Sequence, residues 1–580
     1  MNKSEDMIMI RNKIERGVLL IRQQGIIRTV DYYIKKKSNE KEFLNQVRNY
    51  HLLSEIELET QRKTQHRVSP CISIVTPLYN TPRNFLEELL DSVQNQTYEK
   101  WELCLADGSD DEHDYVRVIC EERAKNDNRI VYKKLLKNEG IVGNTNQCLE
   151  FATGEYVGLL DHDDLLHPAA LFEVVNAIQD GADFIYTDEM KFMDKVENST
   201  NIVCKSGFGK DELRSHNYIC HFVVFKMELL NGMTQVYRKE CEGSQDYDMV
   251  LRLTEKAKKI IHIPKILYYW RVHQGSVAMD LSVKQYAVDA AKRAILGQLH
   301  RSGEEGTISS NLPYQTIYRL NYALKGNPLV SIFLWGELRK TDLKKRIGEI
   351  LENTTYRPLE IIVESDIDNT VVDENVQLSC VPRNSSDEKY VWFNYAKESS
   401  KGDYFVFLYD QCVPETQNWI EELLMFAQRD DVCSVGPQIN YGHQKIYFAG
   451  AVIDKDEQCG IHVINYNHFQ NEEGYEANLK HVRNTTVLSA LCMMVARDKL
   501  EELSGFDIQM KDYGDVDLCL KARNANYWNV WTCFAQIKYQ GKKSVYSNWK
   551  DEGKFREVWD DELKKRDEYY HPFLKQLKKM

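Results

Sequence analysis

An acidic cluster that directly follows an apolar stretch contains the residues best suited to chemistry. Asp161, Asp163 and Asp164 flank His162 immediately after the apolar run of residues 156–160. Three carboxylates so close together repel one another, and a divalent cation with hard oxygen ligands relieves that repulsion. The pattern therefore predicts a Mg²⁺ or Mn²⁺ site whose other ligands are diphosphate oxygens. An acidic turn that caps the next helix is the alternative that this motif alone leaves open.

Four further side chains are candidates for the same site. Asp107 follows another apolar run, and its carboxylate could accept from the imide N–H of uracil or thymine. Asp246 begins a helical pattern, where the helix N-terminus favours the charged form that a base needs. His273 could complete a metal shell and Arg271 could contact diphosphate. A turn carboxylate, a helix cap, a structural histidine and a surface ion pair are the respective alternatives.

Alternating strand and helix patterns supply the scaffold for these residues. From Pro70 onward, short apolar runs alternate with segments whose apolar residues recur at helical spacing. This order predicts an α/β fold with a mostly parallel sheet, in which ligands bind beyond the carboxyl ends of the strands. The expected strands are 71–75, 101–105, 130–132 and 156–160, and the expected helices start near 84 and cover about 112–127 and 142–152.

The pattern occurs twice along the chain. The segment SVQNQTYEKWELCLAD resembles EILENTTYRPLEIIVES, GEYVGLLDHDD resembles GDYFVFLYDQC, and GSQDYDMVLRL resembles YGDVDLCLKA. Two homologous α/β domains in tandem explain these matches. The expected organisation is an N-terminal basic helical region (1–69), a first domain (70–305), a linker (306–327), a second domain (328–545) and a helical C-terminal tail (546–580) that packs on the second domain.

Composition narrows the class of protein. The 580 residues are 43% hydrophobic and carry a net charge of −13, which suits a globular protein and disfavours a nucleic-acid partner. The 14 cysteines form no CxxC pair, so we expect reduced thiols in the cytoplasm. No apolar run is long enough to span a membrane. Residues 1–37 hold nine Lys or Arg against four Asp or Glu, which predicts a basic amphipathic segment that lies on an anionic membrane or packs on the next domain.

The motifs together are more specific than any one of them. VTPLYNTP, ADGSDD, NEGIVGNTN, GEYVGLLDHDD, YTDEM, EGSQDYDMVLR and HIPKILYYWRVHQGS occur in this order over residues 70–300. The set resembles the family 2 glycosyltransferases with the GT-A fold, especially bacterial enzymes of O-antigen, capsule or rhamnan-type polysaccharide synthesis. The resemblance implies inverting transfer of a sugar from a UDP- or dTDP-linked donor to a hydroxyl of a growing or lipid-linked polysaccharide. It also implies work in the cytoplasm, at the inner face of the membrane.

The resemblance also implies roles for individual residues. Asp107 would hold the nucleotide base, and Asp161 with Asp163 would hold the metal and the donor diphosphate. Asp246 would be the general base that deprotonates the acceptor. The nucleotide-contacting first loop of the family corresponds to Thr76, Pro77 and Tyr79.

The second domain loses most of this chemistry. Alignment of the two copies puts Ser365, Tyr409 and Gln411 where the first has Asp107, Asp161 and Asp163, and leaves the single carboxylate Asp410. Asp515 matches Asp246. We therefore expect a degenerate domain that binds acceptor glycan or mediates assembly. Candidate sugar-stacking aromatics are Tyr441, Tyr447, Phe448, Trp528 and Trp531.

Other functions stay open at this point. The second domain could be a weakened transferase that uses Asp515, which would make the protein a bifunctional polymerase, or the whole chain could be a non-catalytic scaffold. A dinucleotide oxidoreductase is disfavoured because VTPLYNTP lacks its glycine motif, and SGFGK near Gly207 has no strand before it. A sugar-nucleotide pyrophosphorylase would need a glycine-rich phosphate loop at the same place.

Overall fold

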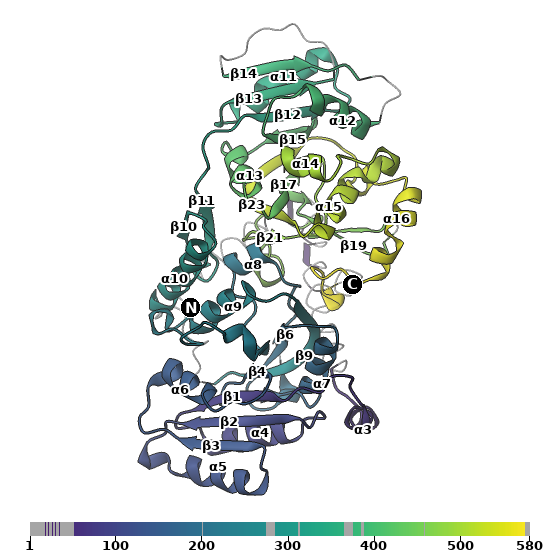
Figure 1. Ribbon diagram of the computed structural model, residues 1–580. Coiled ribbons are helices and arrows are strands. Elements are labelled where there is room, and N and C mark those ends of the chain that lie inside the picture. The colour runs from purple at the N-terminus through teal and green to yellow at the C-terminus, as the bar shows by residue number, and fades with distance from the viewer. Residues whose placement is uncertain are drawn as a thin grey trace.

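The computed structural model has two α/β halves, one for each repeat. It describes residues 51–574 except 200, 274–284, 311–313, 365–374, 384–387 and 458, together with seven positions between 18 and 34. Figure 1 shows the halves one above the other, with the yellow C-terminal part of the ribbon reaching the region between them. The predicted pair of sheet-bearing domains is confirmed.

The first domain is built on a mixed sheet with strand order β3-β2-β1-β4-β8-β6-β9-β5, and β7 pairs with β6. β1, β2, β3 and β4 are parallel, as are β6 and β9, while β8 is antiparallel to both of its neighbours. The elements are β1 (Ile72–Leu78), α4 (Arg83–Gln94), β2 (Trp101–Asp107), α5 (Tyr115–Asn126), β3 (Ile130–Lys134), α6 (Gly140–Leu149), β4 (Tyr156–Leu159), β5 (Leu165–Leu166), α7 (Ala170–Gln179), β6 (Phe184–Phe192), β7 (Asn201–Val203), α8 (Lys210–Ser215), β8 (Val223–Lys226), α9 (Gln245–Thr254), β9 (Ile260–Arg271) and α10 (Gln285–Arg301).

Apolar periodicity explains these elements. Every residue of β1 is buried, as expected for a central strand with helices on both faces. In α4, the apolar face expected from the sequence is the one that packs on the sheet, through Leu86, Leu89, Leu90 and Val93. The strands and helices expected up to residue 160 all form, with ends shifted by a few residues.

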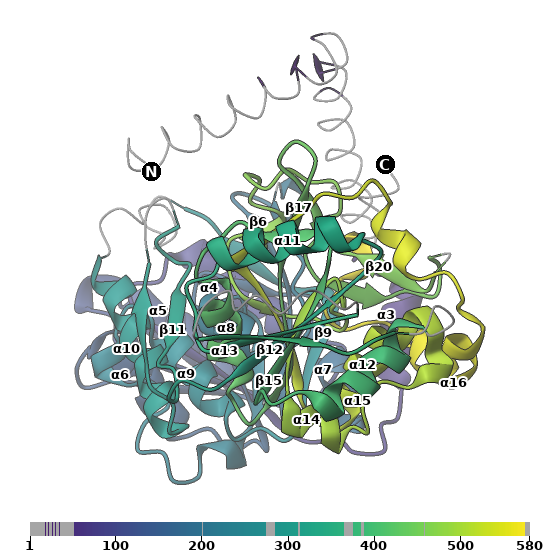
Figure 2. The same ribbon diagram turned by 90° about the horizontal axis from the view of Figure 1, so that it is seen from above.

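The second domain repeats the same topology. Its strand order is β14-β13-β12-β15-β22-β17-β23-β16, which matches the first sheet strand for strand. Figure 2 shows α11 on one side of β12 and β15, and α12 with α15 on the other. The elements are β12 (Val330–Trp335), α11 (Lys340–Glu352), β13 (Leu359–Val363), β14 (Val376–Cys380), α12 (Lys389–Ser399), β15 (Tyr404–Tyr409), β16 (Cys412–Pro414), α13 (Trp419–Ala427), β17 (Val432–Tyr441), β18 (Lys445–Phe448), β19 (Ala451–Ile453), β20 (Ile461–Val463), β21 (Arg483–Asn484), β22 (Cys492–Ala496), α14 (Arg497–Glu502), α15 (Gly514–Asn524), β23 (Trp528–Tyr539) and α16 (Gly553–Lys564).

The two ends of the chain and the connection between the domains complete the molecule. The expected linker contains an antiparallel hairpin of β10 (Gly306–Ser309) and β11 (Arg319–Tyr322). α3 (Glu55–Lys63) starts with a capping box formed by Ser54 and Glu57 and buries none of its residues. The prediction for residues 1–37 falls almost wholly outside the described residues. In the part of the chain that is described, no helix is long and apolar enough to cross a membrane.

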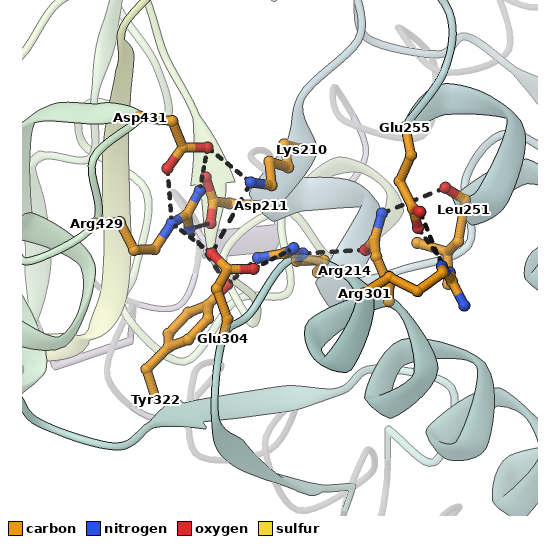
Figure 3. A network of polar contacts seen from close by, with 11 residues as sticks. Lys210, Asp211, Arg214, Leu251, Glu255, Arg301, Glu304, Tyr322, Arg429 and Asp431 are labelled. Carbon is orange, nitrogen blue, oxygen red and sulfur yellow. Dashed lines mark hydrogen bonds and ion pairs between the residues drawn. The ribbon is translucent and has the colours of Figure 1, made fainter.

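A buried network of charges joins the two domains (Figure 3). Arg429, just after α13, forms an ion pair with Asp211 of α8, and both side chains are at most 4% exposed. Arg429 also lies 3.3 Å from Glu304, which binds Arg214 at 2.6 Å. The Tyr322 hydroxyl of the linker accepts hydrogen bonds from both arginines. Because buried charges are stable only when fully paired, this network holds the domains in one arrangement.

Candidate active site

The predicted site lies at the carboxyl edge of the first sheet, where the chain order of the strands reverses. β1 lies between β2 and β4, so successive connections leave it in opposite directions. The last residue of β1, Leu78, is paired with Asp107 at the end of β2. The acidic loop begins directly after β4. This switch point is where doubly wound α/β domains bind ligands.

Two of the three loop carboxylates are half-exposed or near the surface, and each has a histidine partner. The Asp161 side chain is 52% exposed, and its Oδ2 lies 3.7 Å from Nε2 of His221. Asp163 Oδ2 lies 2.9 Å from Nε2 of His273, so the two predicted metal ligands are neighbours. The fold therefore relieves part of the charge repulsion with its own histidines.

Asp164 has a different role, and so does Arg271. The buried Asp164 carboxylate accepts hydrogen bonds from Tyr268 Oη (2.5 Å) and the Arg271 backbone N–H (2.7 Å). Burial, with Asp163 and Asp161 nearby, raises the pKa of Asp164 well above its ordinary value. The Arg271 guanidinium is also buried: it donates to the Asp163 carbonyl at 2.7 Å and to Glu88 at 2.5 Å. These contacts show that Arg271 holds the acidic loop, and its expected contact with diphosphate stays a prediction.

His221 links the acidic loop to β6. Its ring stacks on Tyr268 with 4.9 Å between centroids, and Nδ1 lies 3.4 Å from the buried Glu189 carboxylate. Burial alone would lower the pKa of His221, but Asp161 and Glu189 outweigh burial and raise that pKa to about 10. Glu189 is also paired with Lys205 at 2.9 Å. At neutral pH this histidine is therefore a cation between two carboxylates.

Asp246, the predicted general base, lies in the first turn of α9. Its carboxylate is half-buried and accepts a hydrogen bond from Asn217 at 3.2 Å. Burial raises the pKa of Asp246 above its ordinary value, although the Tyr247 backbone N–H and the charge of His221 act in the opposite direction. The backbone N–H at the start of α9 favours the charged form of Asp246 as expected, but burial has the larger effect. A raised pKa makes this carboxylate a stronger base.

The predicted nucleotide loop is partly exposed. Tyr79, at the end of β1, is 47% exposed, whereas Thr76 is completely buried. Thr76 Oγ1 is a buried polar atom with no hydrogen-bond partner among the described residues. Pro77 pairs with Ala106 of β2 in the sheet. Of the three predicted residues of this loop, Tyr79 is thus the one positioned to contact a ligand directly.

Asp107 is buried and already well satisfied. Its Oδ1 accepts from the Ser109 backbone N–H at 2.8 Å. Its Oδ2 accepts from Tyr132 Oη at 2.7 Å and from Lys134 Nζ at 3.1 Å. A nucleobase that bound Asp107 would have to share Oδ2 with these donors or displace one of them. The 37% exposed side chain of Lys134 is the more easily displaced.

The available donor atoms fit a hard divalent cation. Ligand atoms of Asp161, Asp164 and His221 lie within 4.8 Å of one another. Asp163 and His273 form a neighbouring pair with side chains 20% and 35% exposed. Carboxylate oxygens with an imidazole nitrogen suit Mn²⁺ and Mg²⁺. Since Asp164 is committed to Tyr268 and Arg271, the accessible donors are the predicted Asp161, Asp163 and His273, with His221 beside them.

At the corresponding edge of the second domain, the two candidate carboxylates among the described residues are buried. Asp515, the counterpart of Asp246, is 1% exposed, and its carboxylate accepts from the backbone N–H of Ala490 at 2.9 Å and from Trp549 Nε1 at 3.2 Å. Asp410 is buried and accepts from the Leu338 backbone N–H at 2.7 Å. Both carboxylates therefore stabilise the fold and have no free face for a ligand.

Aromatic rings replace the carboxylates at this second edge. Trp335, Tyr409, Tyr441 and Tyr539 are the last residues of the strands β12, β15, β17 and β23. Neighbouring rings are in contact, with centroids 4.5 Å apart for Trp335 and Tyr409. Of the aromatics expected to stack on sugars, Tyr441 belongs to this group and is half-buried, whereas three are core residues: Tyr447, Phe448 and Trp531. Trp528 contacts Phe208 of the first domain instead.

Sequence reasoning missed several residues of the first site. His221, Glu189, Lys205 and Asn217 have no spacing signal, because they are brought in from β6 and from the chain before β8. Glu189 lies within the motif YTDEM, which contributed to the family resemblance but did not predict that Glu189 contacts His221. The short strand β7 ends just before SGFGK, so the expectation that no strand precedes this fragment is wrong. Gly207 matters sterically, because a side chain there would meet the backbone of Glu568.

The fold and the site define a two-domain α/β protein with a cluster of carboxylates at the switch point of the first sheet. Residues 73–232 match the family model described as "Glycosyl transferase family 2", so the first domain contains a glycosyltransferase domain of that family. This finding agrees with the family expected from the motifs.

Relatives share both domains. The chain is 33% identical over 507 residues to "Uncharacterized protein y4gI" of Sinorhizobium fredii, which covers 84% of this chain and 54% of that protein. It is 29% identical to "O-antigen biosynthesis protein RfbC" of Myxococcus xanthus, over 81% of this chain and 37% of that protein. The chain thus spans about half or less of the length of these relatives.

Shorter matches cover less than half of this chain. "GalNAc(5)-diNAcBac-PP-undecaprenol beta-1,3-glucosyltransferase" of Campylobacter jejuni is 28% identical over 38% of this chain and 71% of its own length. Among solved structures, S. aureus TarS 1-349 in complex with UDP-GlcNAc is 18% identical with a TM-score of 0.33, over 39% of this chain and 66% of that one.

Proposed function

We propose that the first domain transfers a sugar from a nucleoside-diphosphate donor to a hydroxyl of a cell-surface polysaccharide, with inversion at the anomeric carbon. The observation that carries the proposal is the convergence of Asp161, His221 and Asp246 at the switch point of a family 2 glycosyltransferase domain. The similarity to an O-antigen biosynthesis protein and to an enzyme named for a lipid-linked glycan supports a polysaccharide or lipid-linked acceptor.

Asp246 is the base in this scheme. Its carboxylate takes the proton of the acceptor hydroxyl while the acceptor oxygen bonds to the anomeric carbon and the bond from that carbon to the diphosphate breaks. A positioned base of this kind contributes about 10² to 10⁴ in rate. Asn217 holds the carboxylate in place from the chain before β8.

The donor diphosphate binds over the acidic loop. Asp161 and Asp163, with His273, would hold Mn²⁺ or Mg²⁺, and the ion when bound would offset charge on the leaving nucleoside diphosphate. His221 adds a fixed positive charge between Asp161 and Glu189. Asp107 favours uracil or thymine over adenine, because a carboxylate accepts from an imide N–H and adenine has none; the donor is then a UDP- or dTDP-sugar.

The second domain binds the acceptor glycan in this proposal. The half-buried aromatics at the ends of β12, β15 and β17 support this role, because such rings offer apolar faces to sugars with a polar edge nearby. The buried, saturated Asp515 disfavours a second transferase. Variants Trp335→Ala and Tyr441→Ala test it: transfer to polysaccharide falls while donor hydrolysis is kept. Loss of hydrolysis in these variants would contradict the role.

Donor hydrolysis tests the transferase assignment itself. Purified protein is incubated with UDP- and dTDP-sugars, with Mn²⁺ or with EDTA, and nucleoside diphosphate release is measured. We expect release with Mn²⁺ that disappears in Asp163→Ala, and a matched control, Asp180→Ala, at the C-terminal end of α7, keeps full release. Absence of release from every donor, or release that survives Asp163→Ala, would favour the scaffold function instead. Location in the cytoplasm and membrane contact through residues 1–69 stay predictions.

A further inference from the structure

The C-terminal segment reaches across the second domain into the first. Asp188 on β6 is completely buried, and its Oδ2 lies 2.7 Å from Nε2 of His571. His571 Nδ1 accepts the Phe573 backbone N–H at 3.2 Å, so the proton of the ring is on Nε2 and is donated to Asp188. The expected tail therefore packs on both domains and not on the second alone.

Asp188 is the start of a chain of contacts that ends at the acidic loop. Asp188 Oδ1 accepts from the Lys205 backbone N–H at 2.8 Å. Lys205 Nζ lies 2.9 Å from Glu189, and both side chains are at most 4% exposed. Lys205 Nζ also donates to the His221 carbonyl. Glu189 and the carbonyl contact together fix His221, whose ring faces Asp161 at 3.7 Å.

The same segment fills a gap in the packing of the first domain. Phe573 is 4% exposed and belongs to a small apolar cluster with Met190 and Phe192 of β6 and Tyr269 of β9. The Gly207 backbone N–H donates to the Glu568 carbonyl at 2.7 Å, and a Cβ at Gly207 would lie 2.8 Å from that oxygen. Strand β6 carries Glu189, and strand β9 carries the residues that bind Asp164. Both strands are therefore packed against residues more than 300 positions away in sequence.

We propose that His571 is a positioning residue for the first-domain site: through Asp188, Lys205 and Glu189 it holds His221 against the metal-binding loop. This inference rests on the proposed function, because the quantity that it controls is the geometry of the donor site. The first domain then needs the C-terminal segment for its activity, and the two domains act as one catalytic unit.

Calorimetric titration of the full-length protein with UDP in Mn²⁺-containing buffer tests the proposal. His571→Leu removes the Nε2 donor to Asp188 Oδ2, while Asp188 Oδ1 keeps its contacts with the Lys205 backbone N–H and Nε2 of His262. We expect the Kd for UDP to rise about 10- to 100-fold, the usual effect of losing a residue that supports a metal ligand. His571→Gln keeps an N–H donor at similar reach and should restore the affinity to within about 3-fold. Glu568→Gln is the matched control, since it weakens the tail's ion pair with Arg523 without touching Asp188. Unchanged UDP affinity in folded His571→Leu, or equal loss in Glu568→Gln, would overturn the proposal.

Hydrogen exchange gives a second readout that does not depend on UDP. In His571→Leu we expect faster amide exchange in residues 161–164 and 203–222, and slower exchange again in His571→Gln. Unfolding midpoints of all variants show whether the chain is folded at the temperature used. Wild-type protein that binds no UDP would contradict the transferase assignment. If amide exchange is nevertheless faster in His571→Leu and slower again in His571→Gln, the proposed role of His571 in positioning His221 stands. If the exchange of both segments is unchanged in His571→Leu, the positioning chain fails.

Discussion

The two domains share one topology and differ at the edge where ligands bind. At the carboxyl edge of the first sheet, Asp161 is half-exposed and Asp246 half-buried with one side-chain donor. At the same edge of the second sheet, Asp515 is buried and accepts a hydrogen bond on each carboxylate oxygen. Tyr409 ends β15, which is the counterpart of the first-domain strand β4 that precedes the acidic loop. The fold alone therefore does not determine the chemistry; the access and the partners of a few carboxylates do.

The difference also shows what a degenerate copy can still contribute. The second domain retains a full core and a sheet of the same strand order. It contributes Arg429 to the buried charge network. The C-terminal segment that packs on it contacts Asp188 of the first domain through His571. Its residues thus make contacts that hold parts of the first domain in place.

The largest expected effect separates Asp246 from its counterpart. Asp246→Asn keeps the size and the hydrogen bond to Asn217 but removes the base, so we expect transfer to fall by about 10² to 10⁴ with donor affinity unchanged. Initial rates of transfer and calorimetry of the donor check both parts. Loss of donor affinity in this variant would mean that Asp246 binds the donor and is not the base.

The pH dependence of the reaction sharpens the same assignment. Because burial raises the pKa of Asp246, activity should fall as pH drops through a value above that of an ordinary aspartate, and be full at higher pH. The acidic limb of kcat/KM against pH reports this pKa in the free enzyme. A limb at the ordinary aspartate value would show that burial does not dominate at this carboxylate.

Breaking the interface should cost the most stability. Arg429→Ala leaves Asp211 buried without its cation, and we expect a loss of about 3–5 kcal/mol in the free energy of unfolding. Arg301→Ala is the matched control in Figure 3: its pair with Glu255 lies within the first domain with side chains 32% and 23% exposed, and its loss should cost about 1 kcal/mol or less. Denaturant unfolding of the two variants compares them. Equal losses would show that the interface pair has no special weight.

Asp515→Asn should affect stability and leave transfer unchanged. The amide would turn an N–H toward the donors of Ala490 or Trp549, and we expect a loss of about 1–3 kcal/mol. Thermal unfolding and a transfer assay on the same preparation check this. A fall in transfer rate without a fall in stability would revive the bifunctional polymerase.

A buried histidine at the interface makes the stability of the fold depend on pH. Burial, with His216 nearby, lowers the pKa of His481 to about 3, below its unfolded value near 6.5. Folding therefore keeps it neutral, and the folded state loses about 1.4 kcal/mol per pH unit as pH falls from about 6.5 toward about 3. His481→Gln should flatten the pH dependence of unfolding relative to wild type in that window. An identical slope in both proteins would contradict a neutral buried His481.

The sequence predicts the local elements of the first domain well and its long-range contacts poorly. The apolar face of α4 and the run before Asp161 are readable, because periodicity and burial act over a few residues. The buried contacts of Arg271 were not predictable, because residue type does not reveal whether a guanidinium is buried. His571 and Asp188 are 383 positions apart, and no local pattern links them. Such contacts follow from packing of whole elements, which a single sequence does not display.

The stoichiometry of UDP binding in the presence of Mn²⁺ tests the central claim most directly. Calorimetry on the full-length protein should give one site per chain, lost in Asp163→Ala and kept in Tyr409→Phe, a change at the equivalent edge of the second domain. Two sites per chain, or one site that survives Asp163→Ala and disappears in Tyr409→Phe, would contradict the assignment of donor chemistry to the first domain.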